Sequence, residues 1–200
     1  MSEDQQSSLF FDASLAAVSI TIKKGEQAFT TVRVNLWDSS LELYQILQNL
    51  DFDEIGKAVF SRGPGSFTGL RVNMATALGL AAKSPDFVSS VSLSSAIKIL
   101  QGSLIMPVNF RDCIVAYRDQ QRDGDINVEW LKIEQLRKVV DRFDAPVFGF
   151  YREFLPSEIK IEPLCSVSEF LSENFQLLNP LSLRDTVLEY SKSLDFRQIF

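Results

Sequence analysis

The sequence predicts an α/β protein of two lobes, each a mixed sheet flanked by helices in the order βββαβα. Three observations predict this fold class. Apolar strands come in groups of three, a helical stripe and a further strand follow each group, and this succession occurs twice within 200 residues. Three antiparallel strands reach a parallel neighbour only through a crossover, which a helix supplies. We therefore expect an N-terminal lobe at 1–102 and a smaller, divergent C-terminal lobe at 103–200.

The first lobe contains three strands, a helix, a strand, a second helix and a short strand. Segment 23–26 holds one glycine and three charged residues, which indicates a hairpin turn. Leu43, Ile46, Leu47 and Leu50 recur at helical spacing and predict one apolar stripe. The predicted elements are strands at 9–13, 16–22 and 28–36, a helix at 39–50, a strand at 57–61, a helix from 67 to about 83, and a strand at 87–91.

The second lobe repeats this order without sequence identity to the first. Val128 alternates with Glu129 and Leu131 with Lys132, as in a strand with one buried face. The predicted elements are strands at 104–110, 113–118 and 126–133, a helix at 134–143, a strand at 146–150, an extended segment at 159–164, a helix at 166–175, and a last helix at about 183–194.

The composition limits the functions open to this chain. It contains no histidine, which excludes a Ser-His-Asp triad, a Cys-His pair and imidazole metal ligands. Its net charge of −6 is opposite in sign to the basic excess of a nucleic-acid-binding surface. Cys113 and Cys165 lack CxxC spacing and are expected to be reduced core residues. The polar, acidic residues 1–8 and the lack of an apolar run of about 20 residues predict a cytoplasmic protein without a membrane partner.

The most specific feature is a glycine-rich turn at 62–71, Arg-Gly-Pro-Gly-Ser-Phe-Thr-Gly-Leu-Arg, between a strand and an alanine-rich helix. In a structural interpretation, the glycines permit close packing and Ser66 or Thr68 caps the helix. In a functional interpretation, free backbone N–H groups and the helix dipole bind an anion. The spacing matches neither a P-loop nor GxGxxG, so both interpretations stay open.

The helix that follows this turn is apolar on two sides. Leu70 and Ala77 project to one side, while Ala75 and Gly79 project to nearly the opposite side. We expect the first side to cover the sheet. Small residues on the second side let another helix backbone approach closely. Either helix 39–50 of the same chain fills that role, or the two helices together present an apolar surface to a partner protein.

Residues 62–71 resemble the characteristic motif of the TsaB (YeaZ-type) family, the dimerisation subunit of the bacterial machinery that makes threonylcarbamoyladenosine in tRNA. Weaker similarities at 10–14, 79–81, 91–93 and 180–184 follow in the family's order along nearly the whole chain. The resemblance implies the ASKHA (actin-like, RNase H-like) fold of two βββαβα lobes.

The resemblance also implies function by assembly. Family members are similar to the catalytic subunit TsaD, have lost its metal-binding histidines, and pair with it through the helices that flank the glycine motif; the ATPase TsaE joins the complex. We therefore expect a non-catalytic scaffold subunit, without cofactor or metal, for threonylcarbamoylation of adenosine 37 in tRNA, with tRNA involved only indirectly. The expected partner interface comprises Leu43, Leu47, Gly63, Pro64, Gly65, Ser66, Phe67, Thr68, Gly69, Arg71, Val72, Ala75, Thr76 and Gly79.

This sequence departs from the family in the second lobe. Segment 108–115 keeps Arg111 but lacks the acid and the glycine that the family usually has there. We therefore place the predicted site in the first lobe alone. A homodimer through the same apolar surface stays open for the isolated chain.

Two residues keep alternative roles. Asp12 lies at the end of the first strand, where active ASKHA kinases place a carboxylate for metal-bound nucleotide; the simpler interpretation is a turn aspartate that bonds the backbone of Ser14. Phe67 is either a hydrophobic staple or a partner anchor. The alternative function is accordingly an active ASKHA-type phosphotransferase that uses Asp12 and the glycine turn to bind Mg-nucleotide.

Overall fold

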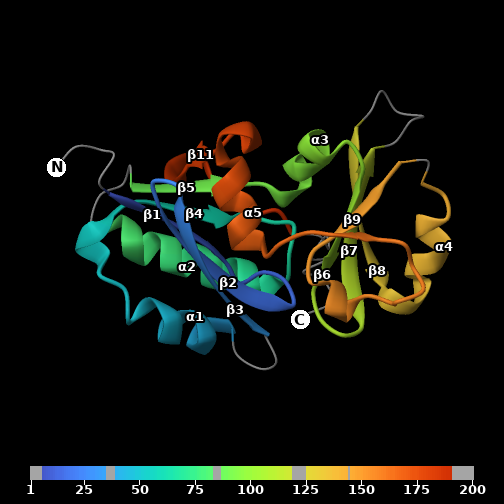
Figure 1. Cartoon of the computed structure of the whole chain (residues 1–200), viewed down its shortest axis with the longest axis horizontal. Coiled ribbons are helices and arrows are strands. Elements are labelled where there is room, and N and C mark those ends of the chain that lie inside the picture. The colour runs from blue at the N-terminus through green and yellow to red at the C-terminus, as the bar shows by residue number, and fades with distance from the viewer. Residues whose placement is uncertain (1–5, 35–38, 83–86, 119–124, 144, 191–200) are drawn as a thin grey trace, which may run out of the picture.

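The computed structural model describes residues 6–34, 39–82, 87–118, 125–143 and 145–190, which form two mixed sheets with helices packed against them (Figure 1). The first sheet has the strand order β11-β5-β4-β1-β2-β3. Its strands are β1 Ser7–Asp12, β2 Ala17–Lys24, β3 Gln27–Val34, β4 Ile55–Ser61, β5 Val88–Val91 and β11 Leu181–Ser182. Strand β1 pairs antiparallel with β2 and parallel with β4, as the predicted crossover requires.

The second sheet has the strand order β10-β9-β6-β7-β8. Its strands are β6 Ser103–Pro107, β7 Asp112–Arg118, β8 Ile126–Lys132, β9 Val147–Gly149 and β10 Glu162–Pro163. Strand β6 pairs antiparallel with β7 and parallel with β9, so it occupies the place that β1 has in the first sheet. The predicted α/β class, with two mixed sheets flanked by helices, is confirmed.

The α-helices in the described residues are α1 Ser39–Leu47, α2 Phe67–Ala81, α3 Ala96–Leu100, α4 Leu136–Val140 and α5 Val167–Asn174. Short 3-10 helices are η2 Phe52–Glu54, η4 Leu93–Ser95, η5 Ile133–Gln135, η6 Arg152–Phe154, η7 Phe175–Leu178 and η8 Leu183–Asp185. Ser66 and Ser166 cap α2 and α5 by accepting hydrogen bonds from the third residue on, Gly69 and Glu169.

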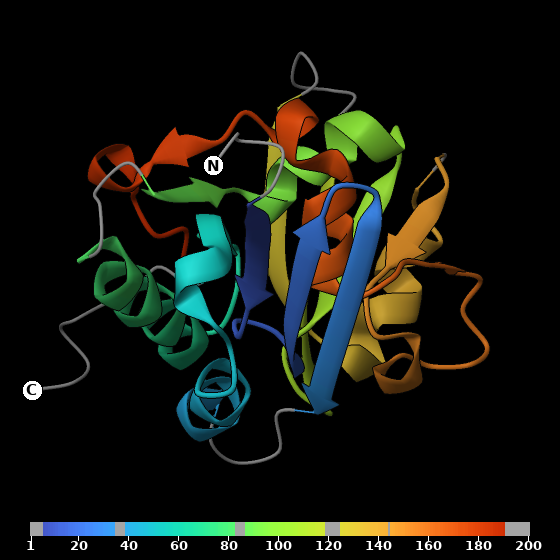
Figure 2. The same cartoon turned by 60° about the vertical axis from the view of Figure 1, so that its left-hand side comes forward.

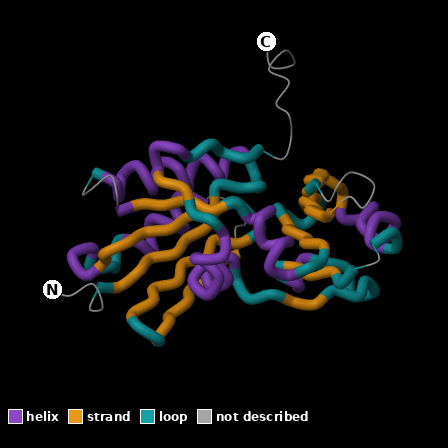
Figure 3. The backbone as a smooth tube through the Cα atoms, turned by 90° about the horizontal axis from the view of Figure 1, so that it is seen from above, coloured by secondary structure: helices purple, strands orange, loops and turns teal. Residues whose placement is uncertain are grey.

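Alternation along β1 explains why helices cover both faces of the first sheet. Leu9 and Phe11 are fully buried in the cluster beneath α1 and α2. Phe10 belongs to the cluster on the opposite face, where α5 packs across β1 and β2. Figure 3 shows helices on both sides of the larger group of strands. A central strand that is buried on both faces is apolar at successive positions, as 9–11 are.

One continuous core joins the two sheets. Phe10 of β1, Met106 of β6 and Phe170 of α5 belong to the same buried cluster. The Ala16 amide donates a hydrogen bond of 2.8 Å to the Pro107 carbonyl and ties the turn after β1 to the second sheet. This turn is therefore fixed at the junction of the two lobes.

The chain returns from the second sheet to the first. Helix α5 lies on β1 and β2, and β11 pairs antiparallel with β5 at the sheet edge, where Figure 2 shows the two strands side by side. Both elements come from the segment 103–200 that the sequence assigns to the C-terminal lobe. The division at residue 102 stays a prediction, and the second sheet itself is built from strands within 103–163.

The predicted helix at 183–194 is wrong over its described part. Ser182 accepts a hydrogen bond from the Asp185 amide and starts a single 3-10 turn, Leu183–Asp185, after which residues 186–190 are not helical. Their polar groups bond to Ser90, Arg62 and Ser92 of the first lobe instead of to each other. Residues 191–194 lie outside the described part of the chain.

Candidate functional site

The glycine turn is packed tightly against the turn that follows β1. Gly63 has φ 118°, which favours glycine over any residue with a side chain. A Cβ on Gly65 would collide with the Ser14 side chain, and one on Gly69 would collide with the Ala13 carbonyl oxygen. These two glycines are therefore needed for close approach of the backbone.

Several backbone amides of this turn donate hydrogen bonds within the chain. The Ser66 amide donates to the Ser14 carbonyl at 2.8 Å, and the Gly69 amide donates to the Ser66 hydroxyl at 3.0 Å. The Gly63 amide donates to the Ser61 hydroxyl at 3.2 Å. Because these donors are satisfied, the geometry favours the structural interpretation of the turn, with Ser66 as the helix cap, over anion binding.

Asp12 is the polar anchor beneath the turn. It is fully buried, and its carboxylate accepts hydrogen bonds from the Ser14 hydroxyl at 2.7 Å, from the Ser14 amide at 3.2 Å and from Asn73 Nδ2 at 3.1 Å. The simpler prediction for Asp12, a turn aspartate bonded to the Ser14 backbone, is confirmed. Burial raises the pKa of Asp12 to about 6, and these hydrogen bonds oppose part of that rise.

Asn73 completes this anchor from α2. Its Oδ1 accepts the Ala13 amide at 2.8 Å, while its Nδ2 donates both to Asp12 and to the Ser61 carbonyl at 2.9 Å. One side chain thus ties α2 to β4 and to the turn after β1. Asn73 therefore has a defined structural role.

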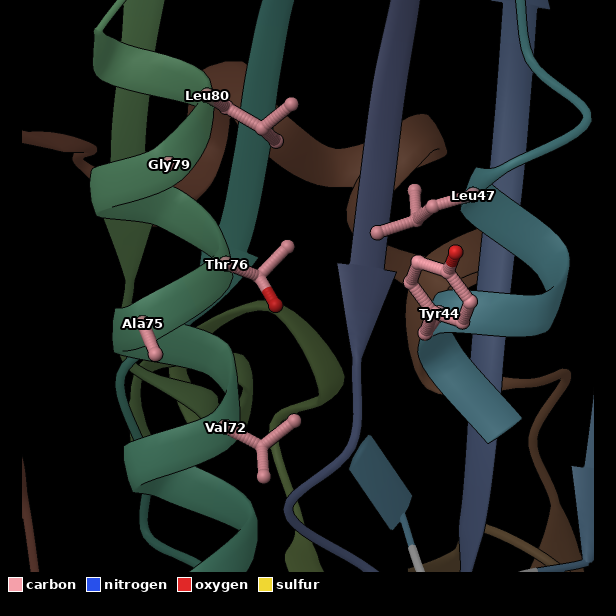
Figure 4. A pocket seen from close by; sticks show the side chains of 7 residues that line it. All are labelled: Tyr44, Leu47, Val72, Ala75, Thr76, Gly79 and Leu80. Atoms are coloured by element: carbon pink, nitrogen blue, oxygen red, sulfur yellow. The ribbon is translucent and has the colours of Figure 1, made fainter. Parts of the chain in front are cut away.

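An apolar groove of about 330 Å³ lies between α1 and α2. It is lined by Tyr44, Leu47, Val72, Ala75, Thr76, Gly79 and Leu80. Figure 4 shows Val72, Thr76 and Leu80 projecting from α2 towards α1, with Tyr44 and Leu47 projecting from α1. The side chains of Ala75 and Gly79 are small, so the outer side of α2 is open to a large neighbouring group.

Large apolar side chains are exposed on α1 and α2, and one of them, Tyr44, lines the groove. The exposed fractions of Tyr44, Leu78 and Phe67 are 62%, 57% and 41%. A Cβ added at Gly79 would meet nothing within 4 Å. This surface is therefore both apolar and unfilled by the described residues.

The predicted interface residues differ in how far they reach the surface. Leu47, Val72, Ala75, Thr76 and Gly79 line the groove, and Phe67, Thr68 and Arg71 are exposed nearer the start of α2. Ser66 is partly buried as the helix cap, whereas Leu43, Gly63, Pro64, Gly65 and Gly69 are buried and lie beneath the groove or the turn.

Sequence reasoning missed Tyr44 and Leu80. Tyr44 precedes Leu47 by three residues, and this spacing places both side chains on one side of a helix. Hydrophobic periodicity does not select Tyr44, because its hydroxyl is polar and it lies beside the apolar stripe of helix 39–50 rather than within it.

Other kinds of site find no support among the described residues. They include no group of three His, Cys, Asp or Glu side chains placed to hold a metal ion. Burial raises the pKa of both the Cys113 and the Cys165 thiols to about 12, which disfavours thiolate chemistry. No helix in the described segments is both long and apolar enough to cross a membrane.

The structure was compared with known proteins. No protein-family model and no curated protein matches the sequence. Among solved structures, YeaZ from Pseudomonas aeruginosa is similar at a TM-score of 0.57 and 16% identity, over 92% of this chain and 99% of that chain. An uncharacterized protein with similarity to peptidase YeaZ from Pseudomonas aeruginosa is similar at 0.57 and 18%, over 94% and 100%. The chain therefore has the two-sheet α/β fold of YeaZ over nearly its whole length.

Proposed function

We propose that this protein is a non-catalytic scaffold subunit that binds a TsaD-type catalytic subunit, with the ATPase TsaE, in the threonylcarbamoylation of adenosine 37 in tRNA. The observation that carries the proposal is the open apolar groove between α1 and α2. The resemblance in sequence implies a partner at the helices that flank the glycine motif, and the groove lies between these helices. The YeaZ-like fold supports the same family.

The chemistry of the groove suits a helix of another protein. Its lining is apolar except for the hydroxyls of Tyr44 and Thr76, and Ala75 and Gly79 leave room for close backbone approach. Burying apolar surface stabilises a complex by roughly 25 cal/mol per Å². Because Tyr44 lines the groove and is 62% exposed, an occupying helix would also bury this side chain.

The described part of the chain does not cover this groove. All its lining residues belong to α1 and α2, and neither the second sheet nor segment 181–190 contributes one. An intramolecular role for the groove is therefore confined to residues outside the described segments. The same surface is available to a second copy of the chain when the partner is missing.

The environment of Asp12 disfavours the alternative function, a phosphotransferase with Mg-nucleotide at this carboxylate. Asp12 is fully buried, and three donors from Ser14 and Asn73 already engage its oxygens. Isothermal titration with ATP and Mg²⁺ distinguishes the two functions. The scaffold proposal expects no binding by the isolated chain, whereas tight binding with turnover would support the phosphotransferase.

Co-purification with the TsaD homologue from the same organism tests the scaffold proposal. Gly79→Leu places a large side chain at the groove, at a position where the added Cβ would meet nothing within 4 Å, so it should abolish capture while the protein stays folded. Tyr44→Ala should weaken binding about tenfold or more, as truncation of an aromatic interface anchor does.

Two controls separate interface effects from general ones. Gly79→Ala adds the smallest side chain at the same position and should weaken capture far less than Gly79→Leu. Leu177→Ala removes an apolar side chain that is 65% exposed away from the groove, and it should leave capture unchanged. Full capture by Gly79→Leu would show that the groove is not the interface.

A further inference from the structure

The C-terminal segment 183–190, here called the strap, runs from the edge of the first sheet to the glycine turn. It follows β11, which pairs with β5. Leu183 packs on the core cluster beneath α1 and α2, and the Thr186 hydroxyl lies 2.6 Å from the Ser90 hydroxyl. The far end of the strap contacts the residues that start α2.

Glu189 joins the strap to the glycine turn. Arg62 Nη1 donates to Glu189 Oε1 at 2.7 Å, and the Ser92 hydroxyl donates to Oε2 at 2.5 Å. The Glu189 amide donates to the Arg62 carbonyl at 2.8 Å. The side chains of Arg62 and Glu189 are only 16% and 33% exposed, so solvent weakens this ion pair less than it would a surface pair.

The next residue, Tyr190, contacts the turn and the first residue of α2. It forms an isolated parallel bridge with Gly65. Its ring centroid lies 5.3 Å from that of Phe67, and the Arg71 guanidinium lies 5.2 Å from the Phe67 ring centroid on the same helix. The strap therefore touches the exposed side of α2 at its start, about one turn before the groove begins at Val72.

We propose that residues 186–190, the end of the strap and here called the latch, can detach from the first sheet. When attached through Glu189, the latch holds the glycine turn and the start of α2 in the conformation that presents the groove to the partner. This inference rests on the proposed function, because it assigns a control to the same groove. Val187 is 74% exposed, and the contacts at Glu189 are polar. Such a segment can open while β11 and the core stay in place.

The closed latch has defined partners that an open latch loses. Departure of Glu189 would leave the Arg62 guanidinium without its carboxylate. Among the described residues the buried Arg62 Nε already has no acceptor, so this loss would leave the guanidinium still less satisfied. Gly63, which faces the Glu189 backbone, would lose the segment that packs on it. The open state is therefore disfavoured but local, which is the property of a two-state element.

Hydrogen exchange followed by mass spectrometry, with limited trypsin digestion, tests the latch on the full-length protein. Glu189→Ala should speed exchange of the peptide covering 62–67 about tenfold and speed cleavage after the exposed Arg184, while peptides of the second sheet stay unchanged. Glu189→Gln keeps hydrogen-bonding capacity without the charge and should give a smaller increase. Val187→Ala is the matched control on the strap and should change neither readout.

Two results would overturn the local part of the proposal. Unchanged exchange at 62–67 in Glu189→Ala would show that the strap does not hold the turn. Faster exchange throughout the protein would show that Glu189 contributes to general stability and not to a local latch.

Binding to the TsaD homologue tests the control over the groove. Glu189→Ala should weaken binding about tenfold, and partner binding should slow cleavage at Arg184 in the wild type, because coupling between two sites is reciprocal. If Gly79→Leu abolishes binding but Glu189→Ala does not weaken it, the latch does not control the groove. If Gly79→Leu binds normally, the proposed function fails, and the exchange data alone decide whether the latch exists.

Discussion

The two ends of helix α2 have different surroundings. Its start packs tightly against the turn after β1, whereas its later turns border a groove that the described residues leave open. At the turn, Gly69 packs directly against the backbone of Ala13 and Ser14. Ten residues later, Gly79 on the same helix has nothing within 4 Å of an added Cβ. The two glycines have the same chemistry and opposite surroundings.

This difference separates the motif from the surface it supports. The glycine turn is the most recognisable part of the sequence, yet its amides and glycines are used for internal packing. The groove has no motif of its own, but it has the exposed apolar surface that a partner requires. The motif therefore stabilises the fold at the start of α2, and in the proposed function the neighbouring helices contact the partner.

The largest expected effect on stability comes from adding a side chain at the tightly packed start of α2, here called its closed end. Gly69→Ala places a Cβ against the Ala13 carbonyl and the Ser14 backbone, neither of which can move without shifting the turn. We expect a loss of about 3 kcal/mol in the free energy of unfolding, as for overpacking against fixed neighbours. Urea denaturation measures it. A stability equal to that of the wild type would mean that the turn can relax, and the contrast between the two ends would disappear.

A second effect, on the pH dependence of stability, comes from the carboxyl group of Asp12, which is buried beneath the glycine turn. Burial raises the pKa of Asp12 from 3.8 to about 6, so the folded protein binds this proton more tightly than the unfolded chain does. The contribution of Asp12 to the free energy of unfolding therefore rises as the pH falls through that window. Between about pH 7.5 and about pH 4.5 the rise is about 2 kcal/mol.

The variant Asp12→Asn isolates this contribution, because it cannot titrate. Urea denaturation at both pH values should show the stability of the wild type rising by about 2 kcal/mol relative to Asp12→Asn as the pH falls. Parallel pH profiles for the two proteins would show that Asp12 keeps an ordinary pKa and that its burial carries no electrostatic cost.

The smallest expected effect has the opposite sign and lies at the open end. Gly79→Ala replaces a helix-interior glycine where a Cβ meets no neighbour, so helix propensity alone should stabilise the protein by about 0.5–1 kcal/mol. Thermal denaturation of the two single variants, Gly79→Ala and Gly69→Ala, makes the comparison directly, because both replace glycine by alanine on the same helix. Destabilisation by Gly79→Ala would indicate an unrecognised contact at the groove.

The sequence predicted the fold class because its signals are local. Strand alternation, the hairpin at 23–26 and the apolar stripes of the helices each depend on residues a few positions apart. The same holds for the Ser66 cap, one of two hydroxyls weighed for that role, and for the Asp12–Ser14 turn. The α2 side of the groove could also be predicted from local spacing, because Val72, Ala75 and Gly79 share one side of a helix.

The remaining features depend on pairs far apart in the chain. Arg62 and Glu189 are separated by 127 positions, and no pattern in either neighbourhood indicates the other. The tail was predicted to be a helix because local periodicity does not show that Ser90, Arg62 and Ser92 compete for its polar groups. Burial of Leu43 between α1 and the first sheet, rather than exposure to a partner, likewise follows from tertiary packing.

The placement of α5 and β11 has a consequence for biosynthesis. A nascent chain that has left the ribosome only as far as residue 165 carries all the groove residues but lacks the helix that covers one face of the first sheet and the strand that completes its edge. Apolar β1 residues such as Phe10 then lack part of their cover. The sheet beneath the groove therefore gains its full cover and its edge strand only after α5 and β11 have been synthesised.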